Sequence, residues 1–487
     1  MKRFLMALAA LLLSGCGELQ EAPAQKVLPW MESKELVVLV QNGPTTLYVD
    51  AEGNYAGLEY DLVTRFAEQH GLKVRFVVTG NHGDVRARLK RGEAHLGVAL
   101  QKGFEGESLM FGPAYQSIQP VLVYKAGLNE ANVWKRLYNG DAVVKTLPQY
   151  VQSLNQLKTR NAGLAWEVIE DGDSETLIER VARGEIDYAL VESHAADVAQ
   201  NYFPNVAVAE QRGDSQQLAW AVPDGDPELL AMINQFVGQQ MADGSMRVLL
   251  DRYYGHVNRV GMGDAQVFQD RIDTILPKYR KWFQEAGAKY DIDWRMLAAL
   301  GYTESHWNPE AVSPYGVRGL MMLTNNTAGY LGVDRLDPYQ SIMGAARLVN
   351  ELRDMVGKDV AEPDRTWLAL AAYNVGFGHL EDARTLARRQ GKNPDLWADV
   401  KTTLPLLRNP EYFSTVKYGY ARGGEPVYYV GKLRTYYDIL ARHEAPAQLD
   451  HPVLAEFVVI DNPGNLPLAI NSRLKGAAAR PVQSASL

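Results

Sequence analysis

The sequence predicts a protein in two parts, an α/β domain of two lobes followed by an all-α domain. Strand and helix patterns alternate from residue 34 to about residue 256, which is typical of a sheet with crossover helices. A helix that ends in Arg-Gly-Glu and is followed by a strand occurs twice in this region. After residue 271 the patterns are helical only. A chain of 487 residues, 46% hydrophobic and 22% charged, can bury more than one core.

Local patterns justify each element of the α/β region. Leu62, Val63 and Phe66 have the spacing of one helix face, and Gly71 ends that helix before a strand begins. The stretches "RLKRGEAHLGVAL" and "RVARGEIDYALV" repeat the helix–strand unit, once in each lobe. In chain order, the first lobe takes 35–41, 57–78 and 84–100, the second takes 142–159 and 174–193, and 216–240 returns to the first.

The order of these segments resembles the family-3 periplasmic solute-binding proteins for amino acids. The matching stretches are "GLEYDLVTRFAEQHGLKVRFV", "LKRGEAHLGVAL", "FGPAY" and "GEIDYALVES". The resemblance implies an α/β two-lobed periplasmic-binding-protein-like domain over residues 34–258. It also implies an Arg for a ligand carboxylate, which residues 99–112 lack, and an ammonium-binding acid at Glu192. We therefore expect either a ligand other than a free α-amino acid or a lobe pair kept as a scaffold.

The first residues have the pattern of a secretory signal. A basic start precedes an apolar stretch at 5–13 that is too short to span a bilayer of about 30 Å. "LSGC" resembles a bacterial lipobox, which implies a signal peptide at 1–15, lipid on Cys16 and a lipidated tether at 16–33. Gly17 in place of Asp implies the outer membrane, with the protein on its periplasmic face. Several acyl chains give the stable membrane anchoring that one chain does not.

The second half of the chain is predicted to be helical. Apolar residues recur at helical spacing, for example Ile272, Ile275 and Phe283 on one face. The tail is rich in Pro and Ala and is expected to be poorly ordered. We therefore divide the second half into a linker at 259–270, a helical domain at 271–445 and a flexible C-terminal tail at 446–487.

Glu304 is the candidate catalytic residue. Its helix has a candidate N-cap at Asp293 and stops by Asn308. Leu297 and Glu304 lie on one face of that helix, so the carboxyl points inward or into a cleft near the helix C-terminus. Burial and the helix dipole both raise the pKa of such a carboxyl. The alternative is a solvated Glu at a frayed helix end.

The motifs around Glu304 resemble those of lytic transglycosylases with a lysozyme-like catalytic domain. "ESHWNPEAVSPYGVRGLMML" matches the first two motifs, "AAYNVGFGHL" the third and "EPVYYVGKL" the fourth, all in the family's order. The resemblance implies an all-α lysozyme-like domain that acts on the glycan strands of peptidoglycan. The front domain would then bind a muropeptide or cell-wall peptide and regulate activity.

The same resemblance implies roles for individual residues, with Glu304 as the sole acid and base. Ser313, Tyr373, Asn374 and Tyr429 are expected to line the cleft and bind substrate.

The sequence departs from two of the family motifs. Met322 also lines the cleft, but it stands where many relatives have Gln. Pro426 and Val427 replace a polar pair, which leaves the role of Glu425 open. From the residues alone, Ser313 is also an ordinary turn residue.

Two further alternatives stay open from the residues alone. Tyr373 and Asn374 also suit helix packing and a helix end.

The chemistry implied by the resemblance needs one carboxyl. Most glycosidases use two. Here Glu304 would protonate the bond between N-acetylmuramic acid and N-acetylglucosamine, and the substrate's own 6-hydroxyl would close a 1,6-anhydro ring. Trp307 is expected to offer an aromatic face to the sugar.

Composition limits the other functions. A net charge of −8 without a basic run argues against nucleic acid as a partner. The histidines have no metal-ligand spacing, so neither a metal nor another cofactor is predicted. A second hypothesis is a lipid-anchored peptidoglycan-binding sensor without turnover.

Overall fold

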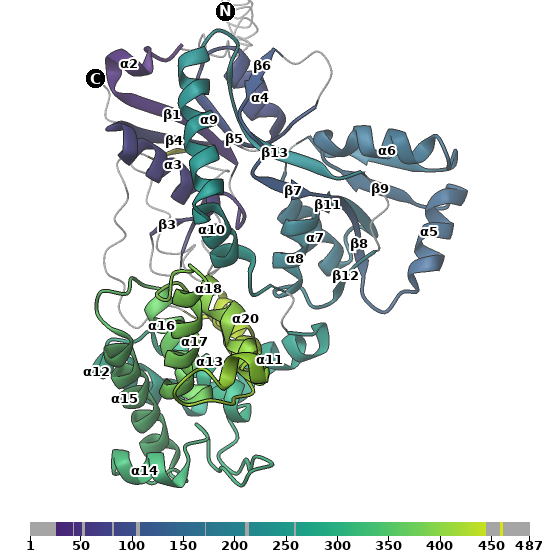
Figure 1. Cartoon of the computed structure of the whole chain (residues 1–487). Helices are drawn as coiled ribbons and strands as arrows, with labels where there is room; N and C mark the ends of the chain where they lie inside the picture. Colours follow the sequence, from purple (N-terminus) through teal and green to yellow (C-terminus); the bar gives the residue numbers. More distant parts are fainter. Residues whose placement is uncertain are drawn as a thin grey trace, which may run out of the picture.

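The computed structural model describes residues 26–444 apart from 42, 51–53, 80–81, 104–107, 171, 210–213 and 258–259, together with 458–460. The predicted signal peptide and Cys16 lie outside these residues. Figure 1 shows an α/β domain of two lobes and, beneath it, a helical domain. The predicted fold class is confirmed.

The first lobe is built on a mixed sheet. Its strands are β1 (Glu35–Gln41), β4 (Lys73–Thr79), β5 (Leu96–Gln101), β6 (Leu109–Phe111), β7 (Gln116–Ile118) and β13 (Gln216–Pro223), with β2 (Tyr48–Val49) and β3 (Tyr55–Ala56) as a separate pair. Its helices are α2 (Trp30–Ser33), α3 (Leu58–His70), α4 (His82–Lys90), α9 (Pro227–Ala242) and α10 (Ser245–Tyr254). β1 is parallel to β4 and β5, and β13 is antiparallel to β5.

Helices cover both faces of this sheet, which is why β1 is an almost unbroken apolar run. Val38 and Val40 pack in the cluster that includes α3 and α9, whereas Val37 and Leu39 pack with α4 on the other face.

The second lobe is a smaller sheet in the order β10-β9-β11-β8-β12. Its strands are β8 (Pro120–Lys125), β9 (Val143–Thr146), β10 (Ala165–Val168), β11 (Tyr188–Glu192) and β12 (Val206–Val208). Its helices are α5 (Glu130–Asn139), α6 (Val151–Lys158), α7 (Ser174–Arg183) and α8 (Ser193–Gln200). The chain enters this lobe between β7 and β8 and leaves it between β12 and β13, so two crossings join the lobes.

The helical domain surrounds one apolar core. Its helices are α11 (Met262–Thr274), α12 (Arg280–Tyr290), α13 (Trp294–Ser305), α14 (Asn325–Leu331), α15 (Pro338–Val356), α16 (Asp364–Val375), α17 (Phe377–Arg389), α18 (Trp397–Thr403), α19 (Pro410–Phe413) and α20 (Gly424–His443). α13 is the central helix: Trp294 to Tyr302 are all buried, and it packs against α12 and α20. α16 and α17 are separated at Gly376, which has φ 90°.

The segment predicted as a linker is part of the helical domain instead. Most of 259–270 belongs to α11. Phe268 is fully buried, with its ring centroid 4.3 Å from that of Tyr302 and 4.4 Å from that of Tyr436. A buried aromatic contact of this kind fixes α11 to α13 and α20, so the segment is packed rather than extended.

Three residues of the predicted flexible tail form a strand. β14 (Val458–Ile460) pairs in parallel with β4 at the edge of the first sheet. The rest of 446–487 lies outside the described residues. The tail prediction is therefore wrong for 458–460, where Val458, Val459 and Ile460 pair with the edge of the sheet despite the Pro- and Ala-rich tail around them.

Candidate active site

Glu304 lies in the last turn of α13. Asp293 caps the start of the helix by accepting the N–H of Arg295 at 2.8 Å, and the helix ends at His306, which has φ 54°. Gly301 lies one turn before Glu304, and a Cβ there would meet Met321 Sδ at 3.0 Å. α13 therefore packs closely on the loop that follows it, which fixes the position of Glu304.

Tyr429 of α20 donates a hydrogen bond to Oε1 of Glu304. Burial raises the pKa of Glu304 to about 7, and the Tyr429 hydrogen bond acts in the opposite direction. The direction agrees with the sequence prediction, with burial as its main cause. A carboxyl of this kind can hold its proton near neutral pH, as a general acid must.

Tyr373 lies beside this pair. Its hydroxyl donates to the carbonyl of Met321 at 2.8 Å. Burial and the nearby charge of Glu304 raise the pKa of Tyr373 well above its usual value, and the same causes act on the pKa of Tyr429. Both phenols therefore stay protonated: Tyr429 donates to the Glu304 carboxyl, and Tyr373 donates to the carbonyl of Met321.

The loop at 319–322 forms a wall next to Glu304. Its shape depends on positive φ angles at two positions, Gly319 and Met322. Gly319 has φ 96°, and a Cβ there would lie 2.1 Å from the carbonyl oxygen of Arg335. Met322 has φ 49° and is partly buried. Only glycine fits position 319 without moving the chain.

Ser305 is a positioning residue to which the sequence prediction gave no role. Its hydroxyl donates to the carbonyl of Leu320 at 2.7 Å and accepts the N–H of Asn308 at 3.1 Å. The signal was its place next to Glu304 in "ESHWNP". The serine ties the catalytic helix to the 319–322 wall.

The other predicted residues have partners other than Glu304 or lie at the surface. Ser313 accepts the N–H of Val317 at 3.1 Å within its own turn, and Asn374 is exposed at the end of α16. Their contact with substrate stays a prediction. Glu425 is exposed and paired with Arg422 at 3.4 Å, on the first turn of α20.

The prediction for Trp307 is wrong. Its side chain is 1% exposed, and its indole N–H donates to the carbonyl of Ala298 at 2.8 Å. His306 and Trp307 both have positive φ, which turns the chain back and points the indole into the core. Trp307 therefore offers no face to a sugar.

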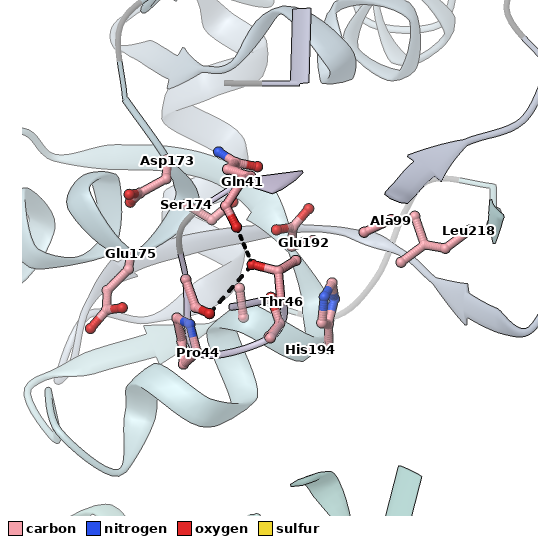
Figure 2. A pocket seen from close by; sticks show the side chains of 13 residues that line it. Gln41, Pro44, Thr46, Ala99, Asp173, Ser174, Glu175, Glu192, His194 and Leu218 are labelled. Atoms are coloured by element: carbon pink, nitrogen blue, oxygen red, sulfur yellow. Dashed lines mark hydrogen bonds between the residues drawn. The ribbon is translucent and has the colours of Figure 1, made fainter. Parts of the chain in front are cut away.

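A second candidate site lies between the two lobes (Figure 2). This pocket is open to solvent, and its lining includes Glu192, the acid that the resemblance assigns to a ligand ammonium. The carboxyl of Glu192 already accepts a hydrogen bond from Tyr150.

Comparison with known proteins decides the family. "Transglycosylase SLT domain" matches residues 281–396, and "Bacterial extracellular solute-binding proteins, family 3" matches residues 36–256. A "Membrane-bound lytic murein transglycosylase F" of Methylobacillus flagellatus is 43% identical, covering 91% of this chain and 95% of that relative. The same name applies to a relative in Nitrosospira multiformis, 40% identical over 93% of this chain and 95% of that relative. The chain belongs to the membrane-bound lytic murein transglycosylase F family.

As a member of the transglycosylase F family, the chain is a peptidoglycan lytic transglycosylase. The SLT match includes Glu304 and Tyr373 but ends before α20. Tyr429, which the fourth motif predicted, is connected to Glu304 by the structure.

The described part of the chain contains no group of three or more His, Cys, Asp or Glu side chains placed to hold a metal ion. Within the same residues, every helix is too short or too polar to cross a membrane.

Proposed function

We propose that the enzyme cleaves the β-1,4 bond between N-acetylmuramic acid and N-acetylglucosamine without consuming water, and releases 1,6-anhydromuropeptides. The observation that carries the proposal is the partly buried Glu304 carboxyl, which accepts a hydrogen bond from Tyr429, lies near Tyr373 and has its pKa raised to about 7. One carboxyl that can hold and then retake a proton is sufficient for this reaction.

The proposed steps balance around one proton. Glu304 gives its proton to the glycosidic oxygen while the bond from that oxygen to C1 of the muramoyl residue breaks. The N-acetyl oxygen of the same sugar stabilises the positive charge at C1, and its 6-hydroxyl then attacks C1. The Glu304 carboxylate removes the hydroxyl proton, which restores the acid. The Tyr429 hydrogen bond stabilises the carboxylate between these steps.

Ser313, Met322 and Asn374 belong to the proposed substrate contacts. Ser313 is partly buried in the turn after α13, Met322 forms part of the wall, and Asn374 is exposed and ready to bond a sugar amide. Their placement around α13 and α16 fits a glycan that runs past Glu304.

Mass spectrometry of digested sacculi tests the reaction. The expected products are anhydro forms, one water lighter than hydrolysis products. Glu304→Gln should abolish turnover while the protein stays folded, and Glu425→Gln serves as the matched control because its carboxyl is exposed. Hydrolysed ends, or an active Glu304→Gln variant, would refute the proposal.

We further infer that the two-lobed domain binds a cell-wall peptide or muropeptide and regulates the enzyme from the outer membrane, where lipid on Cys16 anchors it. The pocket between the lobes and the match to solute-binding proteins support the binding role. The lipobox supports the anchor. Turnover with and without a saturating muropeptide tests the regulation, and labelling with a fatty-acid probe in cells, with Cys16→Ser as the control, tests the anchor.

A further inference from the structure

We propose that the pocket between the lobes binds an ammonium group of its ligand through Glu175, and that the same carboxylate links the pocket to the catalytic domain through Arg442. The inference rests on the proposed regulatory function and deepens it, since it names the ligand chemistry and the contact that transmits binding.

The pocket draws residues from both lobes. The loop at 43–46 and Ala99 come from the first lobe, and the start of α7 and the start of α8 come from the second. Figure 2 shows Asp173 and Glu175 on one side of Thr46, and Glu192 and His194 on the other. A ligand held here touches both lobes at once and can set their separation.

Two polar atoms of the pocket lining have no hydrogen-bond partner. They are Oε2 of Glu175 and Nδ1 of His194, and both are buried. Leaving a buried polar atom unpaired is unfavourable, so a ligand that supplies the missing bonds is stabilised. These atoms mark a binding site that the protein alone does not satisfy.

The charge of the pocket selects the ligand. Asp173, Glu175 and Glu192 are acidic, and no Lys or Arg occurs among the lining residues that the structure describes. Burial lowers the pKa of His194, which favours the neutral imidazole and leaves Nδ1 able to accept. Acceptors in excess of donors fit a group with several N–H bonds and a positive charge, which is a primary ammonium.

Glu175 also binds the catalytic domain. Arg442, near the end of α20, donates to its Oε1 at 2.6 Å and lies 3.4 Å from the ring centre of Tyr202 in the second lobe. Arg–carboxylate pairs often form two parallel bonds. Here one bond is made, and Oε2 of Glu175 and Nε of Arg442 stay unpartnered. Oε2 of Glu175 therefore still lacks a donor, which a ligand ammonium would supply.

α20 connects this contact to the active site. Arg434 on the same helix donates to the carbonyl of Arg252 at 2.8 Å, and Thr435 donates to the carbonyl of His256 at 2.9 Å, both at the end of the first lobe. Tyr429 lies about 20 Å along the helix from Arg442, at a rise of about 1.5 Å per residue. A ligand ammonium that bonds to Glu175 competes with Arg442 for the same carboxylate and weakens the Arg442–Glu175 ion pair. Ligand binding in the pocket and the position of α20 are therefore thermodynamically coupled.

Binding of a defined probe to the full-length protein tests the inference. The probe is the stem tripeptide L-Ala-γ-D-Glu-meso-diaminopimelate in three forms: unmodified, acetylated on the α-amine, and acetylated on the side-chain amine. Titration calorimetry should show at least tenfold weaker binding for one of the two acetylated forms. The amine that is blocked in that form is the ammonium that Glu175 binds. Glu175→Gln should remove this difference, whereas Glu175→Asp, which keeps the charge, should retain it.

Arg442→Gln tests the shared carboxylate. The unmodified probe should bind several-fold tighter to it, because Glu175 no longer shares its charge; a purely structural role of Arg442 would weaken binding. Arg183→Gln is the matched control, since Arg183 forms an exposed ion pair on α7. It should leave unchanged both the affinity for the unmodified probe and the difference in affinity between the probe forms.

The outcomes separate this inference from the proposed function. Equal affinities for all three forms, or an unchanged preference in Glu175→Gln, overturn the ammonium assignment. If the probe still changes turnover in that case, the proposed regulatory function stands although the ammonium assignment is wrong. If no form binds, both are overturned.

Discussion

Tyr429 and Glu304 are 125 residues apart in the chain, and a hydrogen bond from the tyrosine hydroxyl to the carboxyl joins α20 to the last turn of α13. The tyrosine therefore acts on the group that must first release and then retake a proton. It lowers the pKa of Glu304 against the larger, raising effect of burial.

Tyr429→Phe should slow turnover and shift its pH dependence. The carboxylate loses a hydrogen bond worth about 1.5–3 kcal/mol, which corresponds to roughly tenfold to hundredfold in kcat. The pKa of Glu304 should rise, so the alkaline limb of the pH–rate profile moves to higher pH. Tyr428→Phe, at the exposed neighbour, is the control; equal profiles for the two variants would contradict the assignment.

Turnover of the unaltered enzyme should fall as pH rises through about 7, because only the protonated Glu304 can act as the acid. A pH–rate profile on purified glycan strands measures this. Glu304→Asp keeps a carboxyl at this position but moves it, so this slower variant should still show an alkaline limb, displaced in pH from that of the unaltered enzyme. A limb at the same pH in both proteins would assign it elsewhere.

Glu304 should also make stability depend on pH. Its pKa is 4.5 without burial and about 7 in the folded enzyme, so the folded state keeps a proton that the unfolded state has lost between these values. The stabilisation is full below the lower value and is lost as pH rises through the upper one. The Tm of Glu304→Gln relative to the unaltered protein should therefore be higher at pH 8 than at pH 5. Glu59, whose pKa is also raised to about 7, is present in both proteins and cancels.

Gly319→Ala should disrupt the wall beside Glu304. The new Cβ would lie 2.1 Å from the carbonyl oxygen of Arg335, at φ 96°, so the loop must move. We expect a loss of more than about 2 kcal/mol in stability and most of the activity. Gly316→Ala has a similar φ of 76° but no atom within 4 Å, so it should show only backbone strain of about 1 kcal/mol. Thermal unfolding that does not distinguish the two would count against the packing argument.

Ser305→Ala should reduce kcat more than stability. It leaves the Leu320 carbonyl without the serine bond, at a cost of about 1–2 kcal/mol, and loosens the wall next to Glu304. Ser414→Ala removes a comparable serine bond at an exposed helix end and is the control. If both variants keep full kcat, Ser305 has no positioning role.

Much of the fold could be predicted from sequence because local patterns determine it. The period of Leu297 and Glu304 along α13 gave the inward direction of the carboxyl, and the alternation of strands and helices gave the two lobes. Trp307 was placed wrongly because its orientation depends on two residues with positive φ, which hydrophobic spacing does not reveal. α11 was missed because two glycines at its start, Gly261 and Gly263, suggest a linker, while its burial depends on distant aromatic rings. The pairing of Arg442 with Glu175 joins exposed-looking charges 267 positions apart and has no local signature.

The pairing of β14 with β4 has a consequence for how the protein is made. The strand that borders the first sheet is encoded after the entire helical domain. The first sheet therefore keeps an open edge until residues 458–460 are available to pair with β4. The first lobe can be completed only after the helical domain has been synthesised.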